Sequence, residues 1–308
     1  MTDSLTTEDL LLTTPEVPIA ARDFGGEGRP LLLLHGGGGN LATMTTLAAA
    51  LRPGFRVVAV DLRGHGRSGD GPWSWDAVLA DLAAACDELG LVRPAVAGMS
   101  LGGMLAALWA HRHPECPGAV SLDGNPPPSR ADQLSGMPAA EAEAELHRLR
   151  ELFTGMATAM ARPMAPEQVD AAIESARAAA RGHGGAADDW VEGFRRGLVQ
   201  RDDGTALLRP DPTLTEQLRV AMESLDLIPA YRQTRCPLLL VLATEDLPEQ
   251  RPFHELYAAF RRGVAERIAS VADNPCLRVV PLAGASHAMV AERPGEIAAL
   301  ITDFLGER

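Results

Sequence analysis

The stretch "AVAGMSLGGM" (residues 95–104) places one serine between two glycines at the end of an apolar run. The five residues 98–102 separate a segment with the pattern of a buried strand from one with the pattern of a helix. Glycines on both sides allow a helix and its neighbouring strands to approach the corner closely, while the central serine takes a strained backbone. The pattern therefore predicts a strand-to-helix turn that presents the hydroxyl of Ser100 as a nucleophile.

Short apolar runs recur along the chain and alternate with amphipathic stretches. They are residues 30–36, 56–62, 94–100 and 118–124, followed near the C-terminus by 236–246 and 275–282 and a last helix at 294–307. Continuous apolar runs of this length are typical of strands buried on both faces of a parallel sheet. Their alternation with helical patterns predicts an α/β fold with a doubly wound, mostly parallel central β-sheet and right-handed crossovers.

The pattern changes between the two sets of strands. From about residue 130 to 230 the sequence contains helical patterns and no convincing buried strand. Counting residues 30–36 as the third strand, we therefore expect a helical cap, residues 129–230, inserted after strand 6 (residues 118–124) of a core formed by residues 1–128 and 231–308. A chain of 308 residues is long enough for one large domain with such an insertion.

A serine hydroxyl is a weak nucleophile that needs a base within hydrogen-bonding reach. Of the eight histidines, His287 is the best candidate, because it lies in a loop of small residues between the last predicted strand and the last helix. The base in turn needs a carboxylate that holds its tautomer. Asp246, just beyond the seventh predicted strand, is the first candidate for this acid. Asp123, beyond the sixth strand, reaches the same sheet edge and is the alternative.

The oxyanion that develops during attack on an acyl group needs preorganised N–H donors. The segment "HGGGGN" (residues 35–40) follows a predicted strand, and its glycine backbone can approach a substrate closely. We expect the amide of Leu101, directly after the nucleophile, and the amide of Gly37 to form the oxyanion hole, with Gly38 as the alternative to Gly37.

Composition excludes several classes of function. The net charge of −13 disfavours nucleic acids and anionic membranes as partners, and the absence of lysine rules out Schiff-base chemistry. No HExxH is present, and His111 and His113 do not share a helix face, so we expect neither a metal nor a cofactor. The N-terminus lacks the basic region of a signal peptide, no apolar run approaches ~20 residues, and the cysteines form no CxxC. A cytoplasmic protein is the expectation.

Together these motifs make the chain resemble the α/β-hydrolase fold superfamily, in its esterase, haloperoxidase-like and epoxide hydrolase-like group with a serine nucleophile. The matching segments are His35-Gly36, "DLRGHGRS" (61–68), "GMSLGG" (98–103), Asp246 and His287-Ala-Met, in the order serine, acid, histidine. The resemblance covers about residues 18–125 and 232–308, whereas the cap matches only in being helical.

The resemblance implies roles for residues outside the triad. His35 would brace the oxyanion loop, and Asp61, Arg63, His65 and Ser68 would be structural. Dehalogenases and epoxide hydrolases of this group carry an aspartate where Ser100 stands, so those activities are disfavoured.

We therefore expect a serine hydrolase that cleaves an ester, lactone or thioester of a small to medium, mostly apolar substrate through an acyl-enzyme. Alternatives on the same triad are a carbon–carbon bond hydrolase, an amide or peptide hydrolase, and a natural-product tailoring enzyme, because one fold serves many reactions. A non-catalytic small-molecule-binding protein of the same fold is the alternative from another class. The sequence leaves open whether the chain forms a homo-oligomer.

Overall fold

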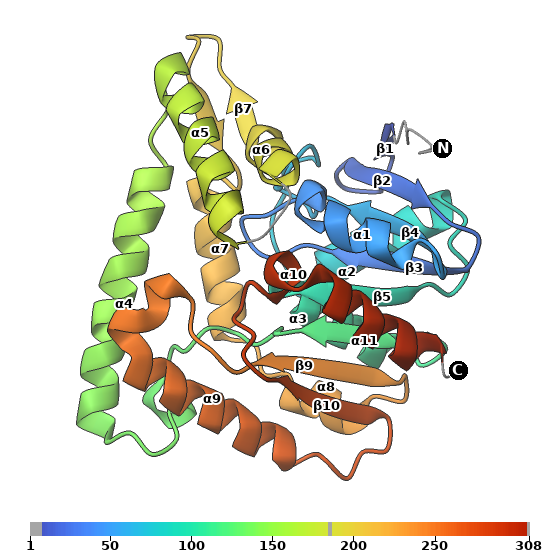
Figure 1. The fold of residues 1–308 in the computed structure, drawn as a ribbon, viewed down its shortest axis with the longest axis vertical. Helices are drawn as coiled ribbons and strands as arrows, with labels where there is room; N and C mark the ends of the chain where they lie inside the picture. Colours follow the sequence, from blue (N-terminus) through green and yellow to red (C-terminus); the bar gives the residue numbers. More distant parts are fainter. Residues whose placement is uncertain (1–7, 184–186, 307–308) are drawn as a thin grey trace.

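An eight-stranded sheet runs through the centre of the molecule (Figure 1). A computed structural model describes residues 8–183 and 187–306. The expectation about a signal peptide concerns the N-terminal segment, of which residues 1–7 lie outside the described ones. In spatial order the strands are β1 (Asp9–Leu12), β2 (Ile19–Gly25), β4 (Phe55–Val60), β3 (Arg29–Leu34), β5 (Ala95–Met99), β6 (Ala119–Leu122), β9 (Leu238–Ala243) and β10 (Leu277–Leu282). All neighbours from β4 to β10 are parallel, whereas β1 and β2 are antiparallel additions. The predicted mostly parallel, doubly wound sheet is confirmed.

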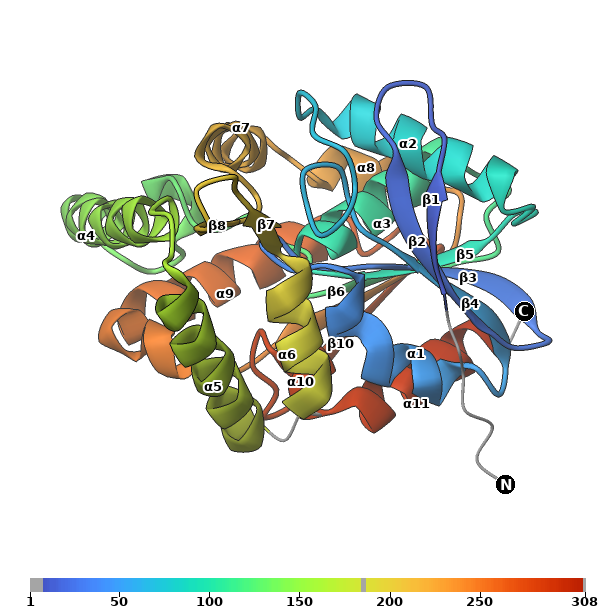
Figure 2. The same ribbon diagram turned by 90° about the horizontal axis from the view of Figure 1, so that it is seen from above.

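Helices cover both faces of this sheet, as Figure 2 shows for α2 and α3 above it and α1 and α11 below it. The core helices and short 3-10 turns are η1 (Leu41–Met44), α1 (Thr45–Leu51), α2 (Trp75–Glu88), α3 (Leu101–Arg112), α8 (Ile228–Gln233), η3 (Pro248–Phe253), α9 (His254–Ala269), α10 (Met289–Glu292) and α11 (Pro294–Gly306). Alternate side chains of each strand enter opposite layers: Leu31 and Leu33 pack with α1 and α11, and Leu32 and Leu34 pack with α2 and α3. Burial on both faces explains why the strands are continuously apolar in sequence.

The chain between β6 and α8 stands to one side of the sheet, at the left of Figure 1. It contains η2 (Ala131–Gln133), α4 (Ala139–Met160), α5 (Pro166–His183), α6 (Ala187–Arg196), β7 (Leu198–Gln200), β8 (Ala206–Leu208) and α7 (Pro212–Glu223). The hairpin of β7 and β8 has no counterpart in the sequence prediction, because strands of three residues are too short to show a periodic pattern. The cap and its bounds, residues 129–230, remain our interpretation of this arrangement.

The C-terminal end of α6 is tied to the core by a buried arginine. Arg196 donates from Nε to Oδ2 of Asp61 at 2.8 Å and from Nη1 to Asp9 in β1. The carboxylate of Asp61 is fully buried and also accepts the amide of Leu41 at 2.8 Å. Burial raises the pKa of Asp61, and the charge of Arg196 opposes that rise. The buried carboxylate of Asp61 keeps its charge because the guanidinium of Arg196 is fixed beside it.

Candidate active site

Ser100 occupies the turn between β5 and α3 with φ +53° and ψ −114°. A residue with a Cβ rarely adopts a positive φ, so this backbone is strained. Two hydrogen bonds of 2.9 Å hold it in place: the Ser100 N–H donates to Leu122, and the Ser100 carbonyl accepts from Met104. The structure therefore has the strained strand-to-helix turn that the sequence predicts.

Glycines beside this turn are required by the close approach of α3 to the sheet. A Cβ on Gly98 would lie 2.2 Å from the carbonyl oxygen of Gly102. A Cβ on Gly102 would lie 2.3 Å from the carbonyl oxygen of Leu34 in β3. Both distances are far below van der Waals contact, and the obstructing atoms are backbone. The two glycines of the motif therefore allow the helix that begins after Ser100 to pack directly on the strands.

His287 and Asp123 meet at the C-terminal edge of the sheet. Nδ1 of His287, in the loop after β10, lies 2.6 Å from Oδ2 of Asp123, directly after β6. The other carboxylate oxygen, Oδ1, accepts the amide of Ala243 at 3.1 Å, and the Asp123 N–H donates to Val241 at 2.7 Å. These contacts with the end of β9 orient the carboxylate while both side chains remain partly accessible to solvent.

Asp246, the first candidate for the acid, is placed elsewhere. Its carboxylate accepts from Arg261 and pairs with His254, both in α9. The expected pairing of Asp246 with His287 is therefore wrong in this structure, and the alternative, Asp123, stands in that place. The physical reason is the course of the chain after β9, which leads through η3 directly into α9 and brings the permanent positive charge of Arg261 to the Asp246 carboxylate.

The glycine segment after β3 lies beside the nucleophile turn. A Cβ on Gly36 would be 3.4 Å from the Cβ of Ser100, and one on Gly37 would be 3.9 Å from the side chain of Leu101. The N–H of Leu101 is the first of α3 and so has no acceptor within the helix. The structure thus brings the two predicted oxyanion-hole segments next to each other.

His35 connects this glycine segment to β4. Its Nε2 accepts the amide of Leu62 at 3.0 Å, which leaves the proton on Nδ1, 2.7 Å from the carbonyl oxygen of Gly36. Complete burial lowers the pKa of His35 to about 4, so the ring is neutral near pH 7. A neutral tautomer fixed by two backbone groups braces the loop, which is the role that the resemblance implies.

The turn of residues 61–68 is held inside the core. Arg63 binds Asp81 through two hydrogen bonds, at 2.6 and 2.8 Å, and Ser68 donates to the carbonyl oxygen of Asp61 at 2.6 Å. Asp61, Arg63, His65 and Ser68 are all buried. Such contacts agree with the structural role expected for the four residues.

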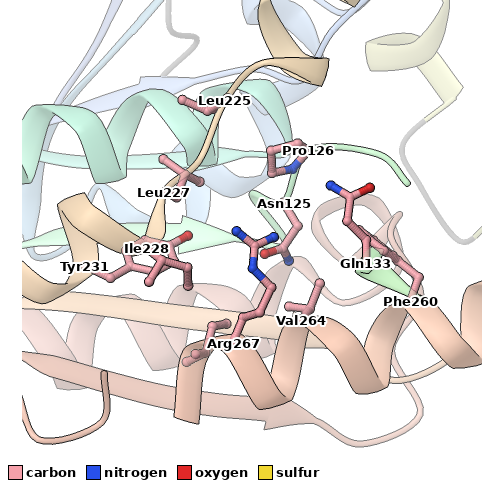
Figure 3. Close-up of a pocket in the computed structure, with 11 residues that line it drawn as sticks. Asn125, Pro126, Gln133, Leu225, Leu227, Ile228, Tyr231, Phe260, Val264 and Arg267 are labelled. Atoms are coloured by element: carbon pink, nitrogen blue, oxygen red, sulfur yellow. The ribbon is translucent and has the colours of Figure 1, made fainter. Parts of the chain in front are cut away.

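A pocket lies next to the turn of Asp123, between the chain that follows β6 and the segment that leads into α8 (Figure 3). Figure 3 shows the side chains of Asn125 and Arg267 pointing into the same space. The other lining residues are mostly apolar: Pro126, Gln133, Leu225, Leu227, Ile228, Tyr231, Phe260, Val264 and Ile268. Arg267 also donates to Asp226 at 2.6 Å, so α9 is connected to the segment through which the chain returns from the cap.

The described residues contain no group of three or more histidine, cysteine, aspartate or glutamate side chains arranged to hold a metal ion. Among the helices in the described ranges, none combines the length and the apolar character needed to cross a membrane.

Comparison with known proteins gives a family. A family model described as alpha/beta hydrolase fold matches residues 29–206, more than half of the chain. A pimeloyl-(acyl-carrier protein) methyl ester esterase of Yersinia pseudotuberculosis is 26% identical over 292 residues, which span 92% of this chain and 95% of that protein. The corresponding esterase of Chromobacterium violaceum is 37% identical over 132 residues, 42% of this chain and 49% of that protein.

Solved structures share the fold over nearly the whole length. The crystal structure of E-2-(acetamidomethylene)succinate hydrolase has a TM-score of 0.71 and 22% identity, and the match covers 97% of this chain and 99% of that one. The thioesterase domain from the curacin biosynthetic pathway has a TM-score of 0.66 and 20% identity, with 96% and 99% covered. At these identities the likeness shows the fold.

Proposed function

Because the chain belongs to the α/β-hydrolase fold family, we propose that it is a serine hydrolase in which Ser100, His287 and Asp123 form the catalytic triad. The observation that carries this proposal is the hydrogen bond of 2.6 Å between His287 and Asp123. It keeps the imidazole proton on Nδ1 and leaves Nε2 as the acceptor for the proton of the serine hydroxyl.

The proposed reaction proceeds in two halves. The Ser100 oxygen attacks the acyl carbonyl carbon while His287 takes the hydroxyl proton, and the amides of Leu101 and Gly37 donate to the oxyanion. Collapse of the tetrahedral intermediate breaks the bond to the leaving group, which receives the proton from His287. A water molecule then gives a proton to His287 and attacks the acyl-enzyme, and a second collapse releases the acid and returns the proton to Ser100.

For the substrate, we propose a small to medium, mostly apolar carboxylic ester, lactone or thioester. The support is the relative of 26% identity, an esterase that aligns with 92% of this chain. The shared fold of a thioesterase domain is consistent with an activated acyl substrate.

The test is hydrolysis of p-nitrophenyl esters of increasing acyl length by the wild type and by Ser100→Ala. We expect turnover by the wild type and a loss of roughly 10⁶-fold in kcat in the variant, because the nucleophile is removed. A fluorophosphonate probe should label the wild type and not Ser100→Ala. The matched control is Ser74→Ala at the N-terminus of α2, where the serine caps the amide of Ala77 and activity should be retained.

Other outcomes would change the assignment in defined ways. A wild type that is labelled but ignores every ester would retain the triad and shift the substrate class to amides or carbon–carbon bonds. A wild type that neither turns over nor is labelled would contradict the proposal and favour the non-catalytic binding protein.

A further inference from the structure

The loop before His287 is held by the carboxylate at the end of α10. Oε1 of Glu292 accepts the hydroxyl of Ser286 at 2.8 Å, and Oε2 lies 3.4 Å from the Ser286 N–H. The Ser286 oxygen also accepts the amide of Ala288 at 3.0 Å. One buried hydroxyl therefore connects Glu292 to the residues on both sides of His287.

The next residue holds the earlier part of the same loop. Arg293 donates from Nη1 to the carbonyl oxygen of Ala283 at 2.9 Å and from Nη2 to that of Gly284. Gly284 has φ +68°, so the chain turns sharply at this point. Two adjacent, oppositely charged side chains thus bind the segment that leads into the histidine.

The hydrogen bond to Asp123 holds the Nδ1 side of the His287 ring. The carbonyl oxygen of Ala285 accepts the amides of Thr244 at 2.9 Å and Glu245 at 3.0 Å, whereas the residues directly flanking His287 are linked to Glu292. The neighbours Gly284, Ala285 and Ala288 have no polar side chain that can anchor the loop, and Ser286 is the exception. Transfer of the serine proton requires Nε2 to be placed accurately, since a displacement of about 1 Å can cost 10²-fold in rate.

We infer that Glu292, acting through Ser286, is a positioning residue that holds His287 in place for proton transfer. The inference rests on the proposed triad of Ser100, His287 and Asp123. Among the described residues, the carboxylate of Glu292 forms its hydrogen bonds with Ser286 and none with the imidazole or with Ser100, so its contribution is to the backbone on which the base is carried.

The experiment compares Glu292→Ala, Glu292→Gln and Ser286→Ala, with Glu296→Gln as the matched control. Oε2 of Glu296 lies 3.4 Å from Nη1 of Arg293, and within the described part of the chain Glu296 forms no hydrogen bond with Ser286. We expect Glu292→Ala and Ser286→Ala each to lower kcat by about 10- to 100-fold with little change in KM. The kcat of the double variant should be no lower than that of either single variant. Glu292→Gln retains an oxygen acceptor and should recover most of the rate, and Glu296→Gln should match the wild type.

A second measurement does not depend on turnover. The low-field proton NMR resonance of His287 Nδ1–H in its bond to Asp123 should broaden or vanish in Glu292→Ala and persist in Glu292→Gln and Glu296→Gln. The inference is overturned if Glu292→Ala loses thermal stability but keeps this resonance and keeps its kcat, where kcat is normalised to the fraction of protein that the fluorophosphonate labels. If the resonance responds as expected and the wild type has no hydrolase activity, the positioning role holds and the proposed function fails.

Discussion

The turns after β6 and β9 each present an aspartate at the same edge of the sheet, and the two aspartates have different partners. Asp123 meets His287, and the two side chains are 18% and 32% exposed. Asp246 is only 7% exposed and meets Arg261 as well as His254. Both aspartates follow an apolar strand in sequence, so the strand before them does not distinguish their roles.

The difference lies in the charge of the partner. An arginine is permanently protonated, and its bond to Asp246 is the same before, during and after any reaction. The imidazole of His287 is able to gain a proton, and a carboxylate beside it stabilises the imidazolium as it forms. A carboxylate assists a catalytic base only where its partner changes charge. In the triad that we propose, Asp123 has His287 as this partner, whereas Asp246 is bound by the permanent charge of Arg261 as well as by the exposed His254.

The largest effect should follow from Asp123→Asn. The amide that replaces the carboxylate favours the wrong imidazole tautomer and gives no charge to stabilise the imidazolium, so we expect kcat for ester hydrolysis to fall by about 10⁴-fold. Steady-state kinetics with the preferred p-nitrophenyl ester measure this loss. Retention of nearly full activity would show that another carboxylate assists His287.

Asp246→Asn should mainly affect stability. The substitution removes the charge that Arg261 faces, so we expect the free energy of unfolding to fall by about 1–2 kcal/mol. The value of kcat should remain within about threefold of the wild type, since the residue does not touch His287.

Urea denaturation measures the stability loss, and Arg261→Gln provides the matched variant. The two substitutions remove the same ion pair, so the double variant should be little less stable than either single variant. If kcat instead collapses in Asp246→Asn while Asp123→Asn stays active, Asp246 is the acid of the triad, as first expected from the sequence.

The smallest effect should come from His254→Gln. The His254 side chain is 67% exposed, and an exposed pair of this kind contributes less than about 1 kcal/mol. We expect unchanged kcat and a denaturation midpoint within error of the wild type. A loss of activity comparable to that of Asp123→Asn would instead make Asp246 and His254 the working pair.

Much of the site could be predicted because its signals are local. The turn around Ser100 depends on glycines two residues away on either side, and the backbone clashes that require them involve elements directly attached to the motif or adjacent in the sheet. The glycine segment after β3 and the loop that carries His287 are equally short-range patterns. The hairpin of β7 and β8 escaped prediction since three-residue strands have no measurable period.

The sequence by itself therefore determined the mostly parallel sheet of the core, the alternation of its strands and helices along the chain, the strained turn at Ser100 and the candidate base. Only the tertiary structure decided which aspartate meets that base. Asp123 and His287 are 164 residues apart, and their contact depends on how β6, β9 and β10 lie side by side. Asp246 is nearer in sequence, yet the arginine of α9 binds it, because pairing across a sheet edge depends on positions in space rather than on separation along the chain.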